Sequence, residues 1–563
     1  MQATTPVHAF SSFHKMLRQS SAVLLLSILT WHCHAQSPQA EHVASPTVTE
    51  EATDTVEVAK HLELDVDASN EIHDAEQHNN DDAITPPNQD EITSSRLKSL
   101  AQLKSLQGVK TTALYQTPFV QELENTAHVR SLFVATQALP IVDIQLTFNA
   151  GSAQDEYIGK GLYGLSSLAA RLMTEGTDQY SAAEVANRFE SLGASFSVSS
   201  YRDMFVIRLR SLSDPQHLQP AIDLMLHILN HATFKRSDLS MMLSSSRVGQ
   251  KQVQENPISL RSFQFYRSVY QEHPYAYPSA GTNLSLTKIT REHLQQFRQQ
   301  LLVKQNMSIA LTGHLSTQQA SDIANKISNS LATGQKAPSL AAANAPQHFN
   351  VQYIPASGQQ AYVMMGHLAV DYADPDRVAL EVANQILGGK GLNSILMREL
   401  RVKHGLTYGI YSQLSALQAR GVFQISYSTA LDDLIFSLTL SHRALIDFVE
   451  QPIDQTALDD VKAGMLRAFP MSFSSNERIN AQIAAMAFYD LPNTYLKDYQ
   501  QQLSSLTAKQ IHQAVQRHLH PDQLTLVVVA ESLDLAALQQ SLEDNLATSR
   551  FALDSKDSKD SKD

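Results

Sequence analysis

The strongest constraint on the fold is a helix-and-strand pattern that the chain carries twice, 217 residues apart. The first copy begins at Thr290, and an apolar strand pattern at residues 307–313 starts 17 residues later. The second begins at Thr507 and leads at the same spacing into residues 524–529. Each threonine is a favourable helix N-cap, and Thr507 with Gln510 fits a capping box. Because 217 residues fit one domain, the pattern predicts a tandem duplication.

Strand and helix patterns alternate through both copies. Residues 141–148 alternate apolar and polar side chains, as a half-buried strand does, and residues 196–198 and 204–209 form a hairpin pattern around residues 201–203. The 563 residues, 43% of them hydrophobic, can fill more than one core. We expect an α+β fold of two homologous α/β domains, each an antiparallel-rich sheet with helices packed on it.

The first 35 residues predict export. They contain Lys15 and Arg18 without an acidic residue, then an apolar run at residues 22–29, then small residues near a possible cleavage site. We therefore expect a signal peptide and a periplasmic location. Because the run is short for a bilayer span and no later stretch reaches about 18 apolar residues, we expect no transmembrane anchor.

Cys33 is the only cysteine, and two interpretations of it stay open. It is either a lipid-modified residue or one that is discarded with the signal peptide. The preceding Thr30-Trp31-His32 fits a lipoprotein signal poorly. Without Cys33 the mature chain has no thiol, which excludes disulfides and thiolate metal sites and suits an oxidising compartment.

The net charge of −13 is concentrated in one segment. Residues 36–95 hold 15 acidic residues against Lys60 alone, so the remainder of the chain is close to neutral and shows no basic patch for nucleic acid. The predicted organisation is a signal peptide (1–35), an acidic disordered linker (36–104), an N-terminal domain (105–335), an interdomain linker (336–346), a C-terminal domain (347–545) and a disordered tail (546–563).

Several ordered motifs carry a family resemblance. They are Gly164-Leu-Ser-Ser-Leu-Ala-Ala-Arg-Leu-Met-Thr-Glu-Gly-Thr177, Phe189-Glu-Ser-Leu-Gly-Ala194, His273-Pro-Tyr275 with Gly281-Thr282, and the stretch from Leu387 to Tyr408. Together they span roughly residues 110–535 and resemble the insulinase, pitrilysin and mitochondrial processing peptidase superfamily of inverzincin zinc peptidases. The match is to its half-length members, which work as paired subunits. The resemblance implies two domains of the processing-peptidase type.

The resemblance also locates a zinc site that this chain has lost. The family places His-x-x-Glu-His on a helix, where the two histidines bind zinc and the glutamate acts as general base. The aligned positions hold Ser167, Ala170 and Arg171. A third ligand, a glutamate, should fall near residues 247–249, but residues 239–253 contain no carboxylate, and Glu255 is the nearest. We expect no catalytic metal in this chain.

Three histidine pairs elsewhere in the chain have spacings that a metal site could use. His227 and His231 have the i, i+4 spacing of zinc ligands, but Asn230 between them is neither a base nor a usual ligand, and the segment fits the end of a packing helix. The other pairs are His73 with His78, in the acidic linker, and His518 with His520, near a helix end. We interpret all three pairs as structural or solvated histidines rather than metal sites.

The second copy keeps the family's other functional pair. In active members an arginine and a tyrosine seven residues apart reach the active site, where the tyrosine donates to the oxyanion and the arginine holds substrate carbonyls. Arg401 and Tyr408 match that spacing. The alternative is that Tyr408 merely starts a core strand and Arg401 is a solvated cation. The turn at residues 388–391 resembles the family's substrate-handling glycine loop, with a tight helix-entry turn as its alternative.

These features lead to two functional hypotheses. The first is a noncatalytic subunit of a periplasmic heterodimeric zinc peptidase, inactive alone. Its homologous partner would carry His-x-x-Glu-His and the zinc, receive Arg401 and Tyr408 in trans, and help to enclose unfolded peptides. The second is an inactive structural or peptide-binding scaffold of the same fold. No nucleophile and base pair supports unrelated chemistry.

Overall fold

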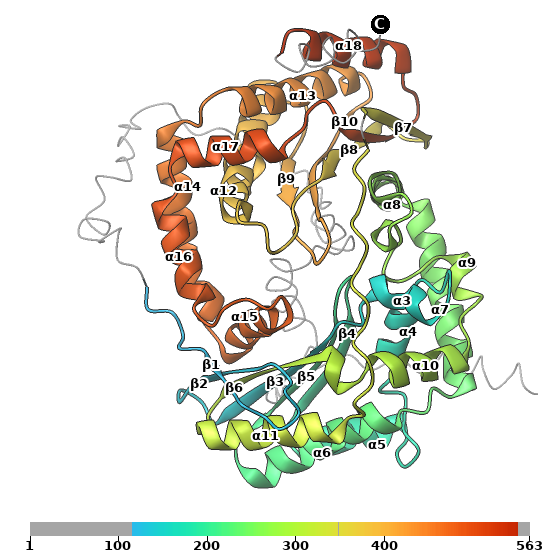
Figure 1. Cartoon of the computed structure of the whole chain (residues 1–563). Coiled ribbons are helices and arrows are strands. Elements are labelled where there is room, and N and C mark those ends of the chain that lie inside the picture. The colour runs from blue at the N-terminus through green and yellow to red at the C-terminus, as the bar shows by residue number, and fades with distance from the viewer. Residues whose placement is uncertain (1–114, 347, 550–563) are drawn as a thin grey trace, which may run out of the picture. The chain divides into compact units, whose positions relative to one another are not determined.

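The computed structural model describes residues 115–346 and 348–549 (Figure 1). The predicted signal peptide, the acidic linker with His73 and His78, and residues 550–563 lie outside them. Within the described ranges, no helix combines the length and the apolar character that a membrane span requires.

The first half of the chain builds a six-stranded sheet in the order β1-β2-β6-β3-β5-β4. Its strands are β1 (Gln121–Glu122), β2 (Ser131–Ala135), β3 (Ile141–Phe148), β4 (Ser195–Ser200), β5 (Phe205–Leu212) and β6 (Met307–Gly313). Its helices are α3 (Asp155–Ile158), α4 (Leu165–Leu172), α5 (Ala182–Ser191), α6 (Pro215–His231), α7 (Arg236–Glu255), α8 (Pro257–Tyr270), α9 (Asn283–Leu286), α10 (Arg291–Leu301) and α11 (Thr317–Ser330).

The second half builds a five-stranded sheet in the order β7-β11-β8-β10-β9. Its strands are β7 (Asn350–Pro355), β8 (Gln360–Leu368), β9 (Ile410–Leu414), β10 (Val422–Ala430) and β11 (Thr525–Ala530). Its helices are α12 (Arg377–Gly388), the π-helical segment η7 (Met397–Lys403), α13 (Leu434–Glu450), α14 (Gln455–Ala468), α15 (Asn476–Phe488), α16 (Tyr495–Ser505), α17 (Ala508–His518) and α18 (Leu535–Ala547).

The two sheets confirm the predicted pair of α/β domains. Apart from β1, both have the same order and strand directions: β2 runs parallel to β6 as β7 does to β11, and every other pairing is antiparallel. Thr290 caps α10 and Thr507 caps α17, each in a capping box. The predicted hairpin is β4 paired with β5. Helix α18 ends at Ala547, two residues beyond the predicted boundary at 545.

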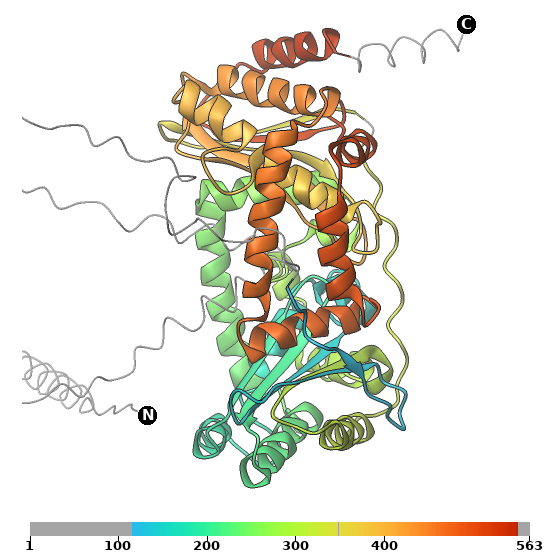
Figure 2. The same cartoon turned by 90° about the vertical axis from the view of Figure 1, so that its left-hand side faces the viewer.

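Each sheet is covered on one face by a helix from the other half of the chain. Helix α15 packs across β2, β6 and β3, and α8 packs on β8 and β11 (Figures 1 and 2). In β6, Ile309 joins the core of the first half, whereas Ala310 belongs to an apolar cluster with Ile483 of α15. In β11, Val527 clusters with Phe265 of α8. Because alternate side chains of a strand face opposite ways, both central strands are buried on both faces.

Buried polar groups also cross between the two halves. The Arg261 guanidinium of α8 donates to the carbonyls of Val363 and Tyr427, at 3.0 and 3.3 Å. Burial lowers the pKa of Arg261 to about 10. The buried Asp203 carboxylate accepts hydrogen bonds from the hydroxyl of Tyr275 and from the backbone N–H of Gln418. These contacts fix the register between the halves, because a buried polar group that loses its partner is costly.

The connection between the halves is packed against both of them. Ala337 and Ala343 are buried, each in a different apolar cluster. Gln154 donates to the carbonyl of Pro338 at 3.0 Å. His273 contacts the carbonyl of Ala341 at 3.0 Å, and burial lowers the pKa of this histidine. The segment at residues 336–346 is therefore part of the interface between the two domains.

The exchanged helix α8 gives the first prediction. Phe265 is fully buried against the second sheet, whereas Phe263 on the same helix is 37% exposed. We expect Phe265→Ala to lower the free energy of unfolding by about 3–5 kcal/mol, because it leaves a cavity at the interface between the halves. Phe263→Ala should change it by less than about 1 kcal/mol. Urea unfolding measures both values, and equal losses would contradict this role of α8.

A buried histidine gives the second prediction. His442 of α13 contacts the carbonyl of Pro521 through Nε2 at 3.0 Å, and burial lowers the pKa of this imidazole to about 4. In the unfolded chain the His442 imidazole titrates near 6.5. Below that pH the unfolded state therefore binds a proton that the folded state does not bind until about pH 4. The free energy of unfolding should therefore fall by up to about 3 kcal/mol as the pH drops from about 6.5 to 4.

The matching variants isolate this contribution. His442→Gln should show a shallower fall in the free energy of unfolding across that pH window, because glutamine does not titrate. His348→Gln, which changes an exposed histidine outside α13, should keep the original pH dependence. Urea unfolding at several pH values between 4 and 7.5 compares the slopes. An unchanged slope in His442→Gln would show that His442 is not the responsible group.

Candidate functional site

A buried carboxylate fixes the start of helix α4, on which the family places its zinc motif. Asp155 is fully buried and accepts hydrogen bonds from the backbone N–H groups of Gly164, Leu165 and Ser166, at 2.8–3.1 Å. Burial raises the pKa of Asp155 to about 7, and the three N–H donors act against that rise. Gly164 has a φ of 94°, and an added Cβ there would meet the backbone at 2.9 Å, so this entry turn requires glycine.

The three motif positions on α4 cannot hold zinc. Ser167 is half-buried, Ala170 is 6% exposed and packs in the core of the first half, and Arg171 is exposed. The guanidinium of Arg171 donates to Ser246 Oγ at 2.9 Å and to Met242 Sδ at 3.2 Å, both on α7. A fixed positive charge thus occupies the space between the two helices, and no carboxylate or imidazole from these positions faces it.

Helix α7 carries the position of the family's third ligand. Its contact with Arg171 passes through Ser246, one residue before the predicted window of residues 247–249. The difference arises because the phase of α7, which the sequence spacing does not define, decides which side chain faces α4. Glu255 is the last residue of this helix. The donor set on α4 and α7 therefore does not fit a catalytic zinc ion.

Arg401 and Tyr408 both lie at the surface of the second half. Arg401 is an exposed residue of η7, and Tyr408 is 86% exposed just before β9. Tyr408 does not begin a core strand, because β9 starts at Ile410 and the tyrosine side chain is exposed. Arg401 matches the other part of the alternative, a solvated cation at a helix end, because it is exposed in the last turn of η7. The pair does not line the large cavity described next.

A cavity of about 1930 Å³ lies mainly within the second half. Its wall includes the turn at residues 388–391, the edge strand β9 and parts of α14 and α16. A Cβ on Gly388 would approach the backbone N of Ser412 to 2.5 Å, so glycine lets α12 pack against β9. The Nε atom of Arg261, the Oδ1 atom of Asn384 and the Oγ atom of Ser394 line this region, shielded from water and without a partner among the described residues.

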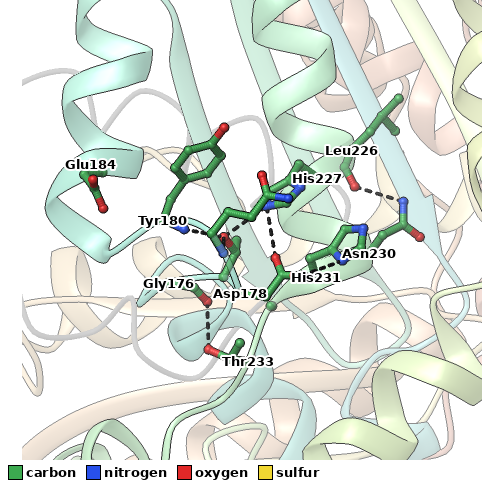
Figure 3. Close-up of polar contacts among 12 residues, drawn as sticks. Gly176, Asp178, Tyr180, Glu184, Leu226, His227, Asn230, His231 and Thr233 are labelled. Carbon is green, nitrogen blue, oxygen red and sulfur yellow. Dashed lines mark hydrogen bonds and ion pairs between the residues drawn. The ribbon is translucent and has the colours of Figure 1, made fainter.

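The structure adds a third residue to the pair His227 and His231. Asp178 Oδ1 lies 3.3 Å from His227 Nε2, and Asp178 Oδ2 lies 3.1 Å from His231 Nδ1 (Figure 3). The two imidazole rings stack with centroids 4.7 Å apart. Burial, and secondly His231, lower the pKa of His227. Sequence reasoning missed Asp178 because it lies 49 residues before His227, and only its position after Gly176-Thr177 hints at a role.

His518 and His520 do not form a site together. His518 Nε2 lies 2.9 Å from Asp376, close to Asp374, but Arg517 donates two hydrogen bonds of 2.9 Å to the same Asp376 carboxylate. His520 is instead half-buried beside His367. The charge that would attract a cation at Asp376 is already balanced by an arginine.

Comparisons with known proteins match both halves. The family model described as Insulinase (Peptidase family M16) matches residues 132–283, and that described as Peptidase M16 inactive domain matches residues 288–465. A protein of Helicobacter pylori named "Non-peptidase homolog YmxG" is 24% identical over 414 residues, covering 72% of this chain and 93% of that protein. An "Uncharacterized zinc protease" of Rickettsia bellii is 23% identical over 372 residues, covering 65% and 88%.

A solved structure extends the match. The crystal structure of a peptidase M16 inactive domain from Pseudomonas fluorescens is 33% identical, has a TM-score of 0.70, and covers 74% of this chain and 98% of that one. The chain therefore belongs to the insulinase family of peptidases, M16. Within that family it is a peptidase-like scaffold of the inactive type.

The cap on α4 gives the third prediction. Asp155→Ala should lower the free energy of unfolding by about 3 kcal/mol, because it leaves three buried N–H groups without an acceptor. Glu292, an exposed first-turn acid of α10, is the matched control, and Glu292→Ala should cost less than about 1 kcal/mol. Denaturant unfolding measures both losses. Equal losses would show that the carboxylate is not required to hold α4.

Proposed function

We propose that this chain is the noncatalytic subunit of a periplasmic heterodimeric zinc peptidase and that it supplies Arg401 and Tyr408 to the active site of its partner. The observation that carries the proposal is the exposure of both side chains. Neither makes a hydrogen bond or an ion pair with another residue in the described part of the chain. A donor held at the surface is available to a second protein.

The chemistry of the pair supports a role in trans. A phenol hydroxyl stabilises the oxyanion that forms when water attacks a peptide carbonyl, and a guanidinium binds carbonyl oxygens with several donors. Such donors need a metal-activated water opposite them, and α4 of this chain cannot provide one because Arg171 occupies the site. The zinc and the His-x-x-Glu-His motif would therefore belong to the partner.

The surface around the pair favours contact with another protein. Val402, next to Arg401, is 61% exposed, and Phe436, which packs against His404 of the same region, is 50% exposed. Large apolar side chains grouped at a surface are typical of a protein interface. Arg401, Val402, Tyr408 and Phe436 together define the proposed partner surface.

An unfolded peptide is the proposed substrate. Strands β4 and β9 are edge strands of their sheets, and an extended peptide can add to such an edge through main-chain hydrogen bonds. β9 lines the cavity, and its wall also carries polar side chains, among them Gln413, Gln424 and Ser426, that suit a polar backbone. The turn at residues 388–391 lies in the same wall, which supports a role in substrate handling.

The second candidate is an inactive peptide-binding scaffold. The same cavity and edge strands favour it, since neither depends on a zinc-bearing partner. The relative in Helicobacter pylori is named a non-peptidase homolog, which also suits this function. The two candidates differ in whether Tyr408 contributes to a hydrolysis rate.

The fourth prediction separates them. The purified full-length chain should hydrolyse no unfolded peptide with or without zinc, and mixing it with an M16-family chain from the same genome that carries His-x-x-Glu-His should produce metal-dependent hydrolysis. Tyr408→Phe should then lower kcat of the mixture by about 10²-fold, the usual effect of losing one oxyanion donor.

Two variants control this experiment. Tyr157→Phe removes the hydroxyl of another exposed tyrosine. Tyr157 lies on α3 in the first half and is not part of the proposed partner surface, so this variant should leave kcat unchanged. Arg401→Lys should raise KM, because a lysine cannot replace the planar set of guanidinium donors. Full activity of Tyr408→Phe in a complex that still assembles would exclude the role in trans and leave the scaffold function.

A further inference from the structure

We propose that Asp178, His227 and His231 form a binding site for a divalent transition metal, with zinc as the ion that best suits them. The site lies on the first half of the chain, where α6 ends and the segment after α4 passes by it (Figure 3). It is separate from the lost catalytic position at Ser167, Ala170 and Arg171 and does not depend on the proposed partner. A metal bound there would link the end of α6 to the segment after α4 that carries Asp178.

The local fold brings the three ligands together without a metal. His227 and His231 are four residues apart in the last turns of α6, so both side chains project on one side of the helix. Asp178 follows the bridge that pairs Thr177 with Ala232. Its backbone N–H donates to the carbonyl of His231 at 3.3 Å, and the N–H of Thr233 donates to the carbonyl of Gly176 at 3.2 Å. Backbone hydrogen bonds thus hold the carboxylate against both imidazoles.

The ligand atoms lie close enough together to bind one ion. Zinc bonds to nitrogen and oxygen are about 2.0–2.2 Å long, so two neighbouring ligands of a tetrahedral ion lie about 3.3 Å apart. Asp178 Oδ1 lies 3.3 Å from His227 Nε2 and Asp178 Oδ2 lies 3.1 Å from His231 Nδ1, so each oxygen of the carboxylate faces one histidine at about this separation. All three ligand atoms lie within 4.8 Å of one another, so a small closure of the imidazoles would complete the arrangement.

Neighbouring side chains orient the His227 ligand. The Thr177 hydroxyl lies 3.0 Å from His227 Nε2, so this side of the ring already faces the site, and a bound metal would replace the contact. The ring of Tyr180 packs edge-on against His227, with centroids 5.2 Å apart, and Arg188 stacks on the outer face of Tyr180 at 4.1 Å. A ligand whose ring is held by packing loses less entropy when it binds a metal.

The charges and the exposure also suit a cation. Asp178 supplies the negative charge and interacts with the charge of the nearby Arg298, whose guanidinium makes its hydrogen bonds with the carbonyls of Asn230 and Ala232 instead. The side chains of Asp178 and His231 are each 49% exposed, so an ion can enter from solvent and retain water in its remaining position. The cluster of Asp374, Asp376 and His518 lacks this advantage, because Arg517 already pairs with its central carboxylate.

Zinc binding by the intact protein tests the proposal. The full-length chain, freed of metal with a chelator, should bind one zinc ion at this site in a calorimetric titration, and zinc should raise its Tm. Asp178→Asn and His231→Ala should each weaken zinc binding at least about tenfold and remove the rise in Tm. Asp178→Asn keeps the size of the side chain, so its effect reports the loss of the charged ligand.

Two further variants make the result specific. His217→Ala changes an exposed histidine that pairs with Asp214 on the same helix but lies outside the cluster, and it should bind zinc like the original chain. His518→Ala removes the histidine of the other cluster and should also have no effect. The proposal is overturned if Asp178→Asn and His231→Ala bind zinc as tightly as His217→Ala, or if only His518→Ala loses the ion.

Discussion

The exchange of α8 and α15 between the halves is the interaction on which the rest of the structure depends. A sheet with helices on one face only would leave the other face of β6 and β11 in water, but every residue of both strands is buried. Each half closes that face of the other sheet, with Phe265 and Ile483 as the central contacts. The polar contacts of Arg261 then tie the two halves at one register, because a slip would leave a buried guanidinium without acceptors.

The fold does not depend on a catalytic centre, because the residues that hold α4 in place are not those at the zinc-motif positions. Helix α4 is held by the buried Asp155 and the glycine turn before it, none of which binds metal. The motif positions could change to Ser167, Ala170 and Arg171 while the helix kept its place against α7. The second half keeps Arg401 and Tyr408 at the surface, where neither contributes to the core. The stability of the core therefore does not depend on either side chain.

Much of the fold could be predicted from local patterns. The alternation at residues 141–148 matches β3 in both bounds, and the threonine caps at Thr290 and Thr507 are present in the structure. The positions of the zinc motif on α4 followed from the family resemblance, and they could be read locally because an i, i+4 motif lies within a single helix. The side chain of α7 that meets Arg171, Ser246, could not be predicted, because the phase of one helix against another depends on packing.

The sequence by itself determined the duplication, the helix and strand types, and which side chains are missing from the zinc motif, because these depend on neighbours within a few turns of the chain. Only the tertiary structure decided that α8 and α15 each pack on the sheet of the other half, and that Asp178 lies beside His227 and His231. Both depend on hydrogen bonds and apolar contacts between segments far apart along the chain. The bridge between Thr177 and Ala232 that positions Asp178 has no local signature, since any residue can supply a backbone N–H and a carbonyl.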